Sequence, residues 1–313
     1  MDDVGRDSSA GTREEAGPPS AGLLADRAAD LNGQGRHDLA EQFARRALAA
    51  DPANAFALLQ IAVAKNETGR AEEAERLALD AIGLAPSAPR AHALLSIIRA
   101  GQGRLAEAEH DILQALRLAP DDAFLYRSYG RLVLRAGQLD KAEKLVRKSL
   151  ELDPQDENTH ALLALVLSER EKKELALGHG QKSLELAPDR DTSHRAMGIA
   201  LLQHGHPFQA RRHLREALRM DPSPDAEELF LEADRCCRLV YLPMYWWSLA
   251  LRRLPGKNIG AYVLFVLICS AARGLGVPGP AVGAFAIAYI AFCIYTWLAT
   301  PLVKLWVRMR PPR

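Results

Sequence analysis

The sequence predicts an all-α solenoid of six helix-turn-helix repeats, followed by a capping helix and a transmembrane helical hairpin. Three observations lead to this fold class. Small residues keep one register through the first two thirds of the chain, and the last third contains two long uncharged stretches. A proline also recurs every 34 residues, at Pro52, Pro86, Pro120, Pro154, Pro188 and Pro222. A fixed period of this length is the signature of stacked structural repeats.

Residues 1–20 precede the first repeat. They are rich in acidic residues, glycine, serine and proline, and they contain no apolar core. This composition predicts a disordered leader and excludes a secretory signal peptide.

Residues 21–224 form six windows of 34 residues. Position 20 of each window is alanine, position 8 is small, and position 28 is a large aliphatic residue. Small residues at positions 8 and 20 should let two helices approach closely. Each window contains two helix-length segments, separated by Gly35, Gly69, Gly103, Gly137, Glu171 or Gly205. Glycine at this place permits the left-handed conformation that ends a helix, and the proline prevents the second helix from continuing. A single hairpin cannot bury its own apolar face, so its stability must come from stacked neighbours.

This pattern closely resembles the tetratricopeptide repeat family, over about two thirds of the chain. The small residue at position 8, glycine at 15, alanine at 20, small residue at 27 and proline at 32 nearly all match the family. Position 4 departs from the family's tryptophan, and in successive windows it is Leu24, Leu58, His92, Tyr126, His160 and His194. We expect these histidines to occupy core or half-buried helix-packing positions. The resemblance also implies a helix that covers the last repeat, which we place at residues 225–240.

The tail of the chain has a different composition. Residues 241–313 contain eight Lys and Arg and no acidic residue, whereas residues 1–240 carry a net charge of −7. Residues 258–272 and 274–303 are uncharged and are separated by Arg273. Since roughly 20 apolar residues cross a bilayer core, residues 258–313 are predicted to be a transmembrane hairpin with a basic tail. The alternative is a pair of buried core helices.

Two further predictions concern the membrane. Seven basic residues flank the hairpin against one at its turn, so both termini and the repeats are expected in the cytoplasm. We expect the membrane to be the bacterial inner membrane. Residues 241–257 combine four aromatic residues with basic ones, which favours a helix in the headgroup layer. Packing of this segment on the end of the solenoid is the other interpretation.

No catalytic motif is present, so we do not expect an enzyme or a cofactor. The three histidines His204, His206 and His213 are close in sequence, but no carboxylate or cysteine accompanies them as a metal site would require. The negative charge of residues 1–240 argues against nucleic-acid binding.

The candidate site is the concave groove that the family resemblance implies, lined by positions 2, 5, 9, 12 and 13 of the first helices. Ala25 and Ala29 stand where some heat-shock co-chaperones of the family have a carboxylate clamp, so that clamp is missing. Position 9 is apolar in four windows, as Val63, Ile97, Leu165 and Ile199, and basic groove positions are Arg90, Arg127, Arg131, Arg135 and Arg195. Such a trough suits a protein or peptide segment with acidic and apolar residues. The alternative is a solvated arginine stripe paired with neighbouring acids.

These patterns predict a membrane-anchored scaffold that recruits a protein partner to the cytoplasmic face and contacts lipid through its hairpin. An assembly factor or chaperone for a membrane protein complex is the alternative. In that case small residues such as Gly279, Gly283 and Ala286 would let the hairpin pack against other membrane helices.

Overall fold

A computed structural model describes residues 20–237 together with Ala284 and Ile287. The predicted leader (1–20), interfacial segment (241–257) and transmembrane hairpin (258–313) lie outside the described residues, apart from Ser20, Ala284 and Ile287. The chain divides into two compact units, residues 1–132 and residues 133–313, and each is described by itself.

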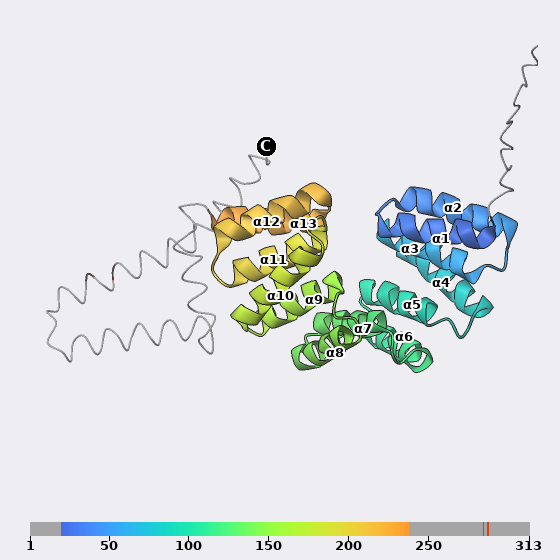
Figure 1. Ribbon diagram of the computed structural model, residues 1–313, viewed down its shortest axis with the longest axis horizontal. Helices are drawn as coiled ribbons and strands as arrows, with labels where there is room; N and C mark the ends of the chain where they lie inside the picture. The colour runs from blue at the N-terminus through green and yellow to red at the C-terminus, as the bar shows by residue number, and fades with distance from the viewer. Residues whose placement is uncertain (1–19, 238–283, 285–286, 288–313) are drawn as a thin grey trace, which may run out of the picture. The chain divides into compact units, whose positions relative to one another are not determined.

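The first unit contains three helical hairpins and most of a seventh helix (Figure 1). The hairpins are α1 (Ala21–Gly33) with α2 (His37–Ala50), α3 (Ala55–Glu67) with α4 (Ala71–Leu84), and α5 (Pro89–Gly101) with α6 (Leu105–Leu118). Helix α7 (Ala123–Arg135) follows. Successive hairpins are in contact, since α2 packs on α3 and α4 packs on α5. A core cluster with Leu59 and Ala78 from the second repeat and Leu94 and Ile98 from the third shows that apolar burial holds neighbouring hairpins together.

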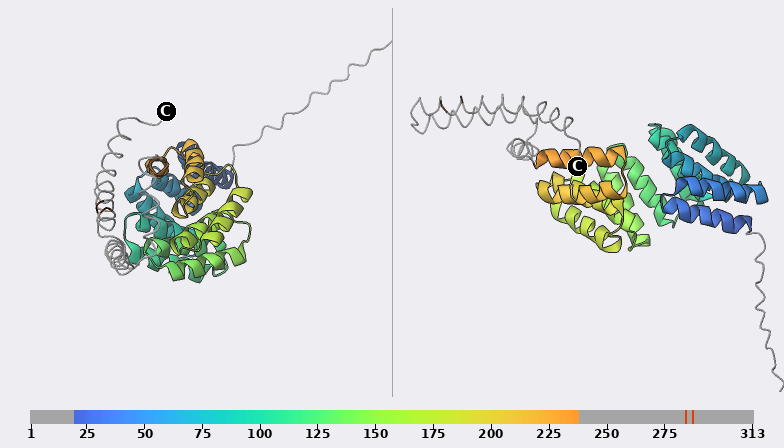
Figure 2. Two further views of the ribbon diagram at one scale, coloured as in Figure 1. Left: turned by 90° about the vertical axis from the view of Figure 1, so that its left-hand side faces the viewer. Right: turned by 90° about the horizontal axis from the view of Figure 1, so that it is seen from above.

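The second unit begins within α7 and continues the same pattern (Figure 2). Its helices are α8 (Leu139–Leu152), α9 (Glu157–Glu169), α10 (Lys173–Leu186), α11 (Asp191–Gln203), α12 (Pro207–Met220) and α13 (Pro224–Cys236). Within the described residues, each 34-residue window therefore corresponds to two helices, and one further helix follows the last window, as the sequence predicts.

The turn inside each hairpin has the predicted backbone conformation. Five glycines occupy it with positive φ, namely Gly35, Gly69, Gly103, Gly137 and Gly205, and Glu171 takes the same place in the fifth repeat with φ 56°. A side chain in this left-handed region is strained by its Cβ. The fifth repeat thus keeps the geometry of the others although it lacks the glycine.

Positions 8 and 20 bring the two helices of a hairpin together. In the third repeat, the Ser96 hydroxyl donates to the carbonyl oxygen of Ala108 at 2.7 Å. In the sixth repeat, a Cβ added to Gly198 would lie 2.5 Å from Cγ of Leu214 and 3.4 Å from the carbonyl oxygen of Ala210. The small residues are therefore required by close approach of the helices, as expected from their register.

The three histidines at position 4 contact the turn that precedes their own repeat. Each places its Nε2 near the carbonyl oxygen of the proline that ends the preceding repeat: His92 with Pro86 at 3.1 Å, His160 with Pro154 at 3.2 Å, and His194 with Pro188 at 3.0 Å. His160 is buried and the other two are half-buried. The prediction of core or half-buried packing positions is confirmed.

Helix α13 covers the sixth repeat. Ser223 caps its first turn, and Phe230 and Cys236 join Leu201 and Leu214 in one core cluster. Arg211 on α12 also pairs with Asp234 on α13, with Nε 3.1 Å from Oδ1. The helix begins at Pro224 and packs on the sixth repeat, and residues 238–240 of the predicted capping helix lie outside the described residues.

Candidate partner-binding surface

The candidate surface lies on the first helices of the repeats, which contact one another in order within each unit: α1 with α3 and α3 with α5 in the first, α9 with α11 in the second. Positions 2, 5 and 9 of these helices differ in exposure. Ala25, Leu59, Ala93 and Ala161 at position 5 are buried, whereas Arg127 and Arg195 at the same position are half-buried. At position 5 the arginines therefore contribute more accessible surface than the apolar residues do.

In the first unit, Phe124 lies between two guanidinium groups. Cζ of Arg90, on α5, is 4.4 Å from the centroid of the Phe124 ring, and Cζ of Arg127, on α7, is 5.2 Å from it. Asp122 fixes this group, because its carboxylate pairs with Nε of Arg90 at 3.3 Å and accepts from the backbone N–H of Phe124 at 2.8 Å. Cation–π contact orients both arginines, and the Asp122 carboxylate partly neutralises Arg90.

Apolar side chains lie along the same row of helices. Val63 and Ile97 at position 9 are half-buried, and Val63 packs against the core cluster of the second and third repeats. Phe56, at position 2 of the second repeat, is 43% exposed. The first unit therefore combines a pair of oriented guanidinium groups with accessible apolar surface.

The second unit carries the remaining residues of the predicted groove. Leu165 on α9 and Ile199 on α11 are half-buried. Arg195 keeps 34% of its side chain exposed and lies 3.7 Å from the carboxylate of Asp191, one turn earlier on α11. This arginine is partly neutralised within its own helix.

Comparison with known proteins identifies the repeat. One tetratricopeptide repeat model matches residues 31–98, and a second matches residues 94–157. Residues 31–157 therefore match tetratricopeptide repeats. No curated protein sequence matches it.

Solved structures share the fold. A chain of the APC/C hetero-tetramer Cut9–Hcn1 is similar with a TM-score of 0.57 at 18% identity, over 68% of this chain and 43% of that one. A tetratricopeptide repeat protein from Parabacteroides merdae is similar with a TM-score of 0.56 at 18% identity, over 71% of this chain and 87% of that one. At this level of identity the similarity concerns the fold.

The arginines of the fourth tetratricopeptide repeat do not form one uniform stripe. Arg127 is half-buried against Phe124, whereas Arg131 and Arg135 are exposed. Arg127 and Arg131 belong to the first unit and Arg135 to the second, because the division falls after residue 132, inside α7. The structure thus brings together Arg90 and Arg127 from the predicted set, through a phenylalanine that the sequence argument did not include.

A second group of polar residues was not predicted from the sequence. Position 21, on the second helix, is a glutamate in the first four repeats, as Glu41, Glu75, Glu109 and Glu143. Three of these carboxylates bind cations of the following repeat: Glu41 with Lys65 at 2.9 Å, Glu75 with Arg99 at 3.0 Å, and Glu143 with Lys172 at 2.9 Å. The fourth, Glu109, accepts from the hydroxyl of Tyr129 at 2.6 Å. We call the first three contacts the inter-repeat ion pairs.

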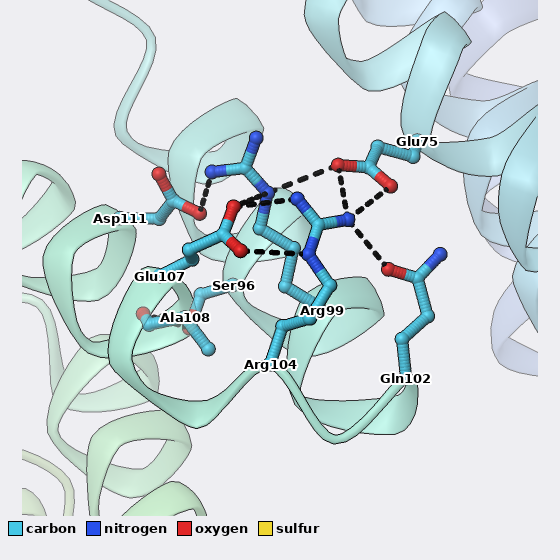
Figure 3. Close-up of polar contacts among 8 residues, drawn as sticks. All are labelled: Glu75, Ser96, Arg99, Gln102, Arg104, Glu107, Ala108 and Asp111. Carbon is cyan, nitrogen blue, oxygen red and sulfur yellow. Dashed lines mark hydrogen bonds and ion pairs between the residues drawn. The ribbon is translucent and has the colours of Figure 1, made fainter.

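The ion pairs around Glu75 form the largest of these networks (Figure 3). Its carboxylate also binds Arg104 at 2.8 Å, and Arg99 reaches onward to Asp111 at 2.9 Å. Burial acts to raise the pKa of Glu75, but hydrogen bonds from Arg99 and Arg104 outweigh it, and the pKa lies below its ordinary value. For Asp111 burial prevails over the same arginine, and the pKa is raised. The network links the second helix of the second repeat to both helices of the third.

Among the residues that the structure describes, no group of three or more His, Cys, Asp and Glu could hold a metal ion. No helix between residues 20 and 237 has the length and apolar character needed to cross a membrane.

Proposed function

We propose that this protein is a scaffold that binds a protein segment along the first helices of its repeats and is held at a membrane by its C-terminal region. Tetratricopeptide repeat proteins mediate protein–protein interactions, and their fold is in general a non-catalytic scaffold. A structural relative takes part in the hetero-tetramer Cut9–Hcn1. The fold therefore supports a binding function for this chain.

The observation that carries the proposal is the arrangement of Arg90 and Arg127 around Phe124. Guanidinium groups form strong, geometrically specific hydrogen bonds with carboxylates, and here the ring orients two of them at 4.4 and 5.2 Å. Val63 and Ile97 add apolar surface on neighbouring helices. An extended or helical segment with acidic residues next to apolar ones complements this surface in both charge and polarity.

Membrane attachment is the second part of the proposal and is supported by the sequence alone. Residues 274–303 contain thirty uncharged residues in succession, more than the roughly 20 that a helix needs to cross the hydrocarbon core. The basic residues beside both uncharged stretches favour a hairpin with the repeats and both termini on the cytoplasmic side. We expect the full chain to fractionate with membranes, and recovery as a soluble protein after removal of detergent would contradict this part.

Binding is tested with a matched pair of variants in a crosslinking pull-down of the full chain. Arg90→Gln/Arg127→Gln removes the two oriented charges, and Arg76→Gln/Arg117→Gln removes two exposed charges from the second helices α4 and α6. A partner captured by the wild type and by the second variant, but lost by the first, would support binding at the first helices. The same partners with both variants would contradict it.

The alternative function, assembly of a membrane complex through the hairpin, is favoured by the small residues of residues 279–288, which permit close packing of membrane helices. Replacement of residues 258–313 by an unrelated membrane anchor separates the two. A scaffold should keep its partner with the foreign anchor, whereas an assembly factor should lose its activity.

A further inference from the structure

Two histidine pairs occupy equivalent places in the fifth and sixth repeats. His160 on α9 and His179 on α10 bring their Nδ1 atoms to 3.0 Å, with ring centroids 5.2 Å apart. His194 on α11 and His213 on α12 do the same at 3.2 Å and 5.4 Å. Each pair joins position 4 of the first helix to position 23 of the second, so it lies between the two helices of one hairpin.

Hydrogen bonding fixes the proton positions in each neutral pair. A carbonyl oxygen accepts only, so Nε2 of His160 must carry the proton that it donates to Pro154, and Nε2 of His194 must donate to Pro188. A neutral imidazole has one N–H, which leaves Nδ1 of His160 and of His194 as acceptors. The Nδ1 atoms of His179 and His213 are then the donors.

A pair with this arrangement accepts one further proton and resists a second. The first can bind Nε2 of His179 or His213 and leaves the shared hydrogen bond intact. The second must bind an Nδ1 atom that already accepts a proton, so two N–H groups and two positive charges would face each other at about 3 Å. The hydrogen bond between the helices would be replaced by repulsion.

The surroundings of both pairs increase this resistance. Burial, the neighbouring His160 and Arg147 of α8 lower the pKa of His179 below its ordinary value. Burial, the neighbouring His194 and Arg212 of α12 lower the pKa of His213 in the same way. Arg147 and Arg212 are cations, so each of them opposes a second positive charge on the histidine pair beside it.

We propose that the fifth and sixth repeats are an acid-sensitive segment of the solenoid, in which protonation of both histidines of a pair opens the hairpin that they join. Proton linkage gives the direction of the pH effect. As the pH falls below about 6.5, every histidine of the unfolded hairpin takes up a proton, whereas each pair in the folded hairpin excludes one. The stability of the folded hairpin therefore falls with the pH. Between pH 7.5 and 5.5 the opening equilibrium should shift by up to about tenfold for each pair. If the proposed function is also correct, a partner bound to Leu165, Arg195 and Ile199 on the same helices would be released in mild acid.

The second repeat supplies matched substitutions, because the same two positions are both aliphatic there. Positions 4 and 23 are Leu58 and Leu77 in the second repeat, and both are half-buried against its core. The variant His160→Leu/His179→Leu/His194→Leu/His213→Leu therefore gives the fifth and sixth repeats the pair found in the second. His179→Asn/His213→Asn is a milder variant that keeps a neutral N–H donor near each Nδ1. His110→Gln, on the exposed face of α6, is the control.

The test is hydrogen–deuterium exchange of the full chain at pH 7.5 and 5.5, with protection factors corrected for the pH dependence of intrinsic exchange. In the wild type and in His110→Gln, protection of α9–α12 should fall at pH 5.5 while that of α1–α6 stays constant. The leucine variant should keep its protection, and the asparagine variant decides the matter if the leucine variant does not fold. Unchanged protection of α9–α12 in the wild type, or an equal fall in the leucine and asparagine variants, would overturn the proposal. Hydrogen–deuterium exchange is measured without a partner, so its result can contradict this proposal without contradicting the proposed function.

Discussion

Glu143 and Lys172 are 29 residues apart in the chain, yet Nζ of the lysine lies 2.9 Å from Oε2 of the glutamate. The glutamate ends no helix and caps none; it joins the second helix of one repeat to the turn of the next. Arg170 and Arg147 bind the same carboxylate, at 2.7 and 2.9 Å. One nearly buried anion thus holds three cations from two consecutive repeats.

Glu143→Gln should destabilise the second unit. The substitution leaves three cations around a neutral amide, and hydrogen bonds to charged groups contribute about 1.5–3 kcal/mol each. Because the cations remain partly exposed, we expect a loss of about 1–2 kcal/mol. Glu151→Gln is the control, since Glu151 is 67% exposed beside Lys148, and it should cost less than about 0.5 kcal/mol. Urea denaturation measures both, and equal effects would show that the ion pairs do not hold the repeats together.

The inter-repeat ion pairs should also make the free energy of unfolding depend on pH in strong acid. Burial acts to raise the pKa values of Glu41 and Glu143, but hydrogen bonds from Lys65 and Lys172 outweigh it and lower them. A carboxylate with a lowered folded-state pKa gives stability that is complete above its unfolded pKa of about 4.3 and lost as the pH falls through the folded value. Stability measured from pH 5 to pH 2.5 should therefore decline less steeply in Glu41→Gln/Glu75→Gln/Glu143→Gln than in the wild type. Parallel curves would contradict this assignment.

Gly198→Ala should destabilise the sixth repeat. An added Cβ would meet Cγ of Leu214 at 2.5 Å and Cδ2 at 2.7 Å, and forcing an extra methyl into a packed interface costs about 1–3 kcal/mol. Gly178→Ala is the matched control in α10, where a Cβ has nothing within 4 Å. It should instead stabilise by about 0.5–1 kcal/mol, because alanine favours the helix. Thermal unfolding followed by circular dichroism distinguishes the two signs.

Glu171→Gly should stabilise the fifth repeat. Glu171 has φ 56° where the other five repeats have glycine, and a Cβ in this region costs about 1–2 kcal/mol. Greater freedom of glycine in the unfolded chain offsets part of the gain, so we expect about 0.5–1 kcal/mol. The reverse change, Gly137→Glu, should lower the melting temperature. A stable Gly137→Glu protein with unchanged melting temperature would show that the turn relaxes to another conformation.

The sequence by itself determined the repeat. The recurrence of Pro52 and its equivalents, the constant alanine at position 20 and the glycine of each turn are local signals, because each acts through the backbone of its own hairpin. They placed the helices and the breaks between them, including the break at Glu171, and they indicated the covering helix near Pro224. Hydrophobic and steric patterns with a fixed period can be recognised in the sequence alone, because the same residue types recur at the same position of every repeat.

The tertiary structure decided which side chains meet across repeats. Arg90 and Phe124 are one repeat period apart and Glu75 contacts Arg99 of the next repeat, but no apolar pattern in the sequence indicates either contact. The sequence likewise contains His160, His179, His194 and His213, but only the structure shows that they meet as two pairs. Charged and polar contacts depend on side-chain direction over a few ångströms, whereas burial depends on the face of a helix alone. The candidate surface was therefore predictable as a row of helices, but its oriented guanidinium pair was not.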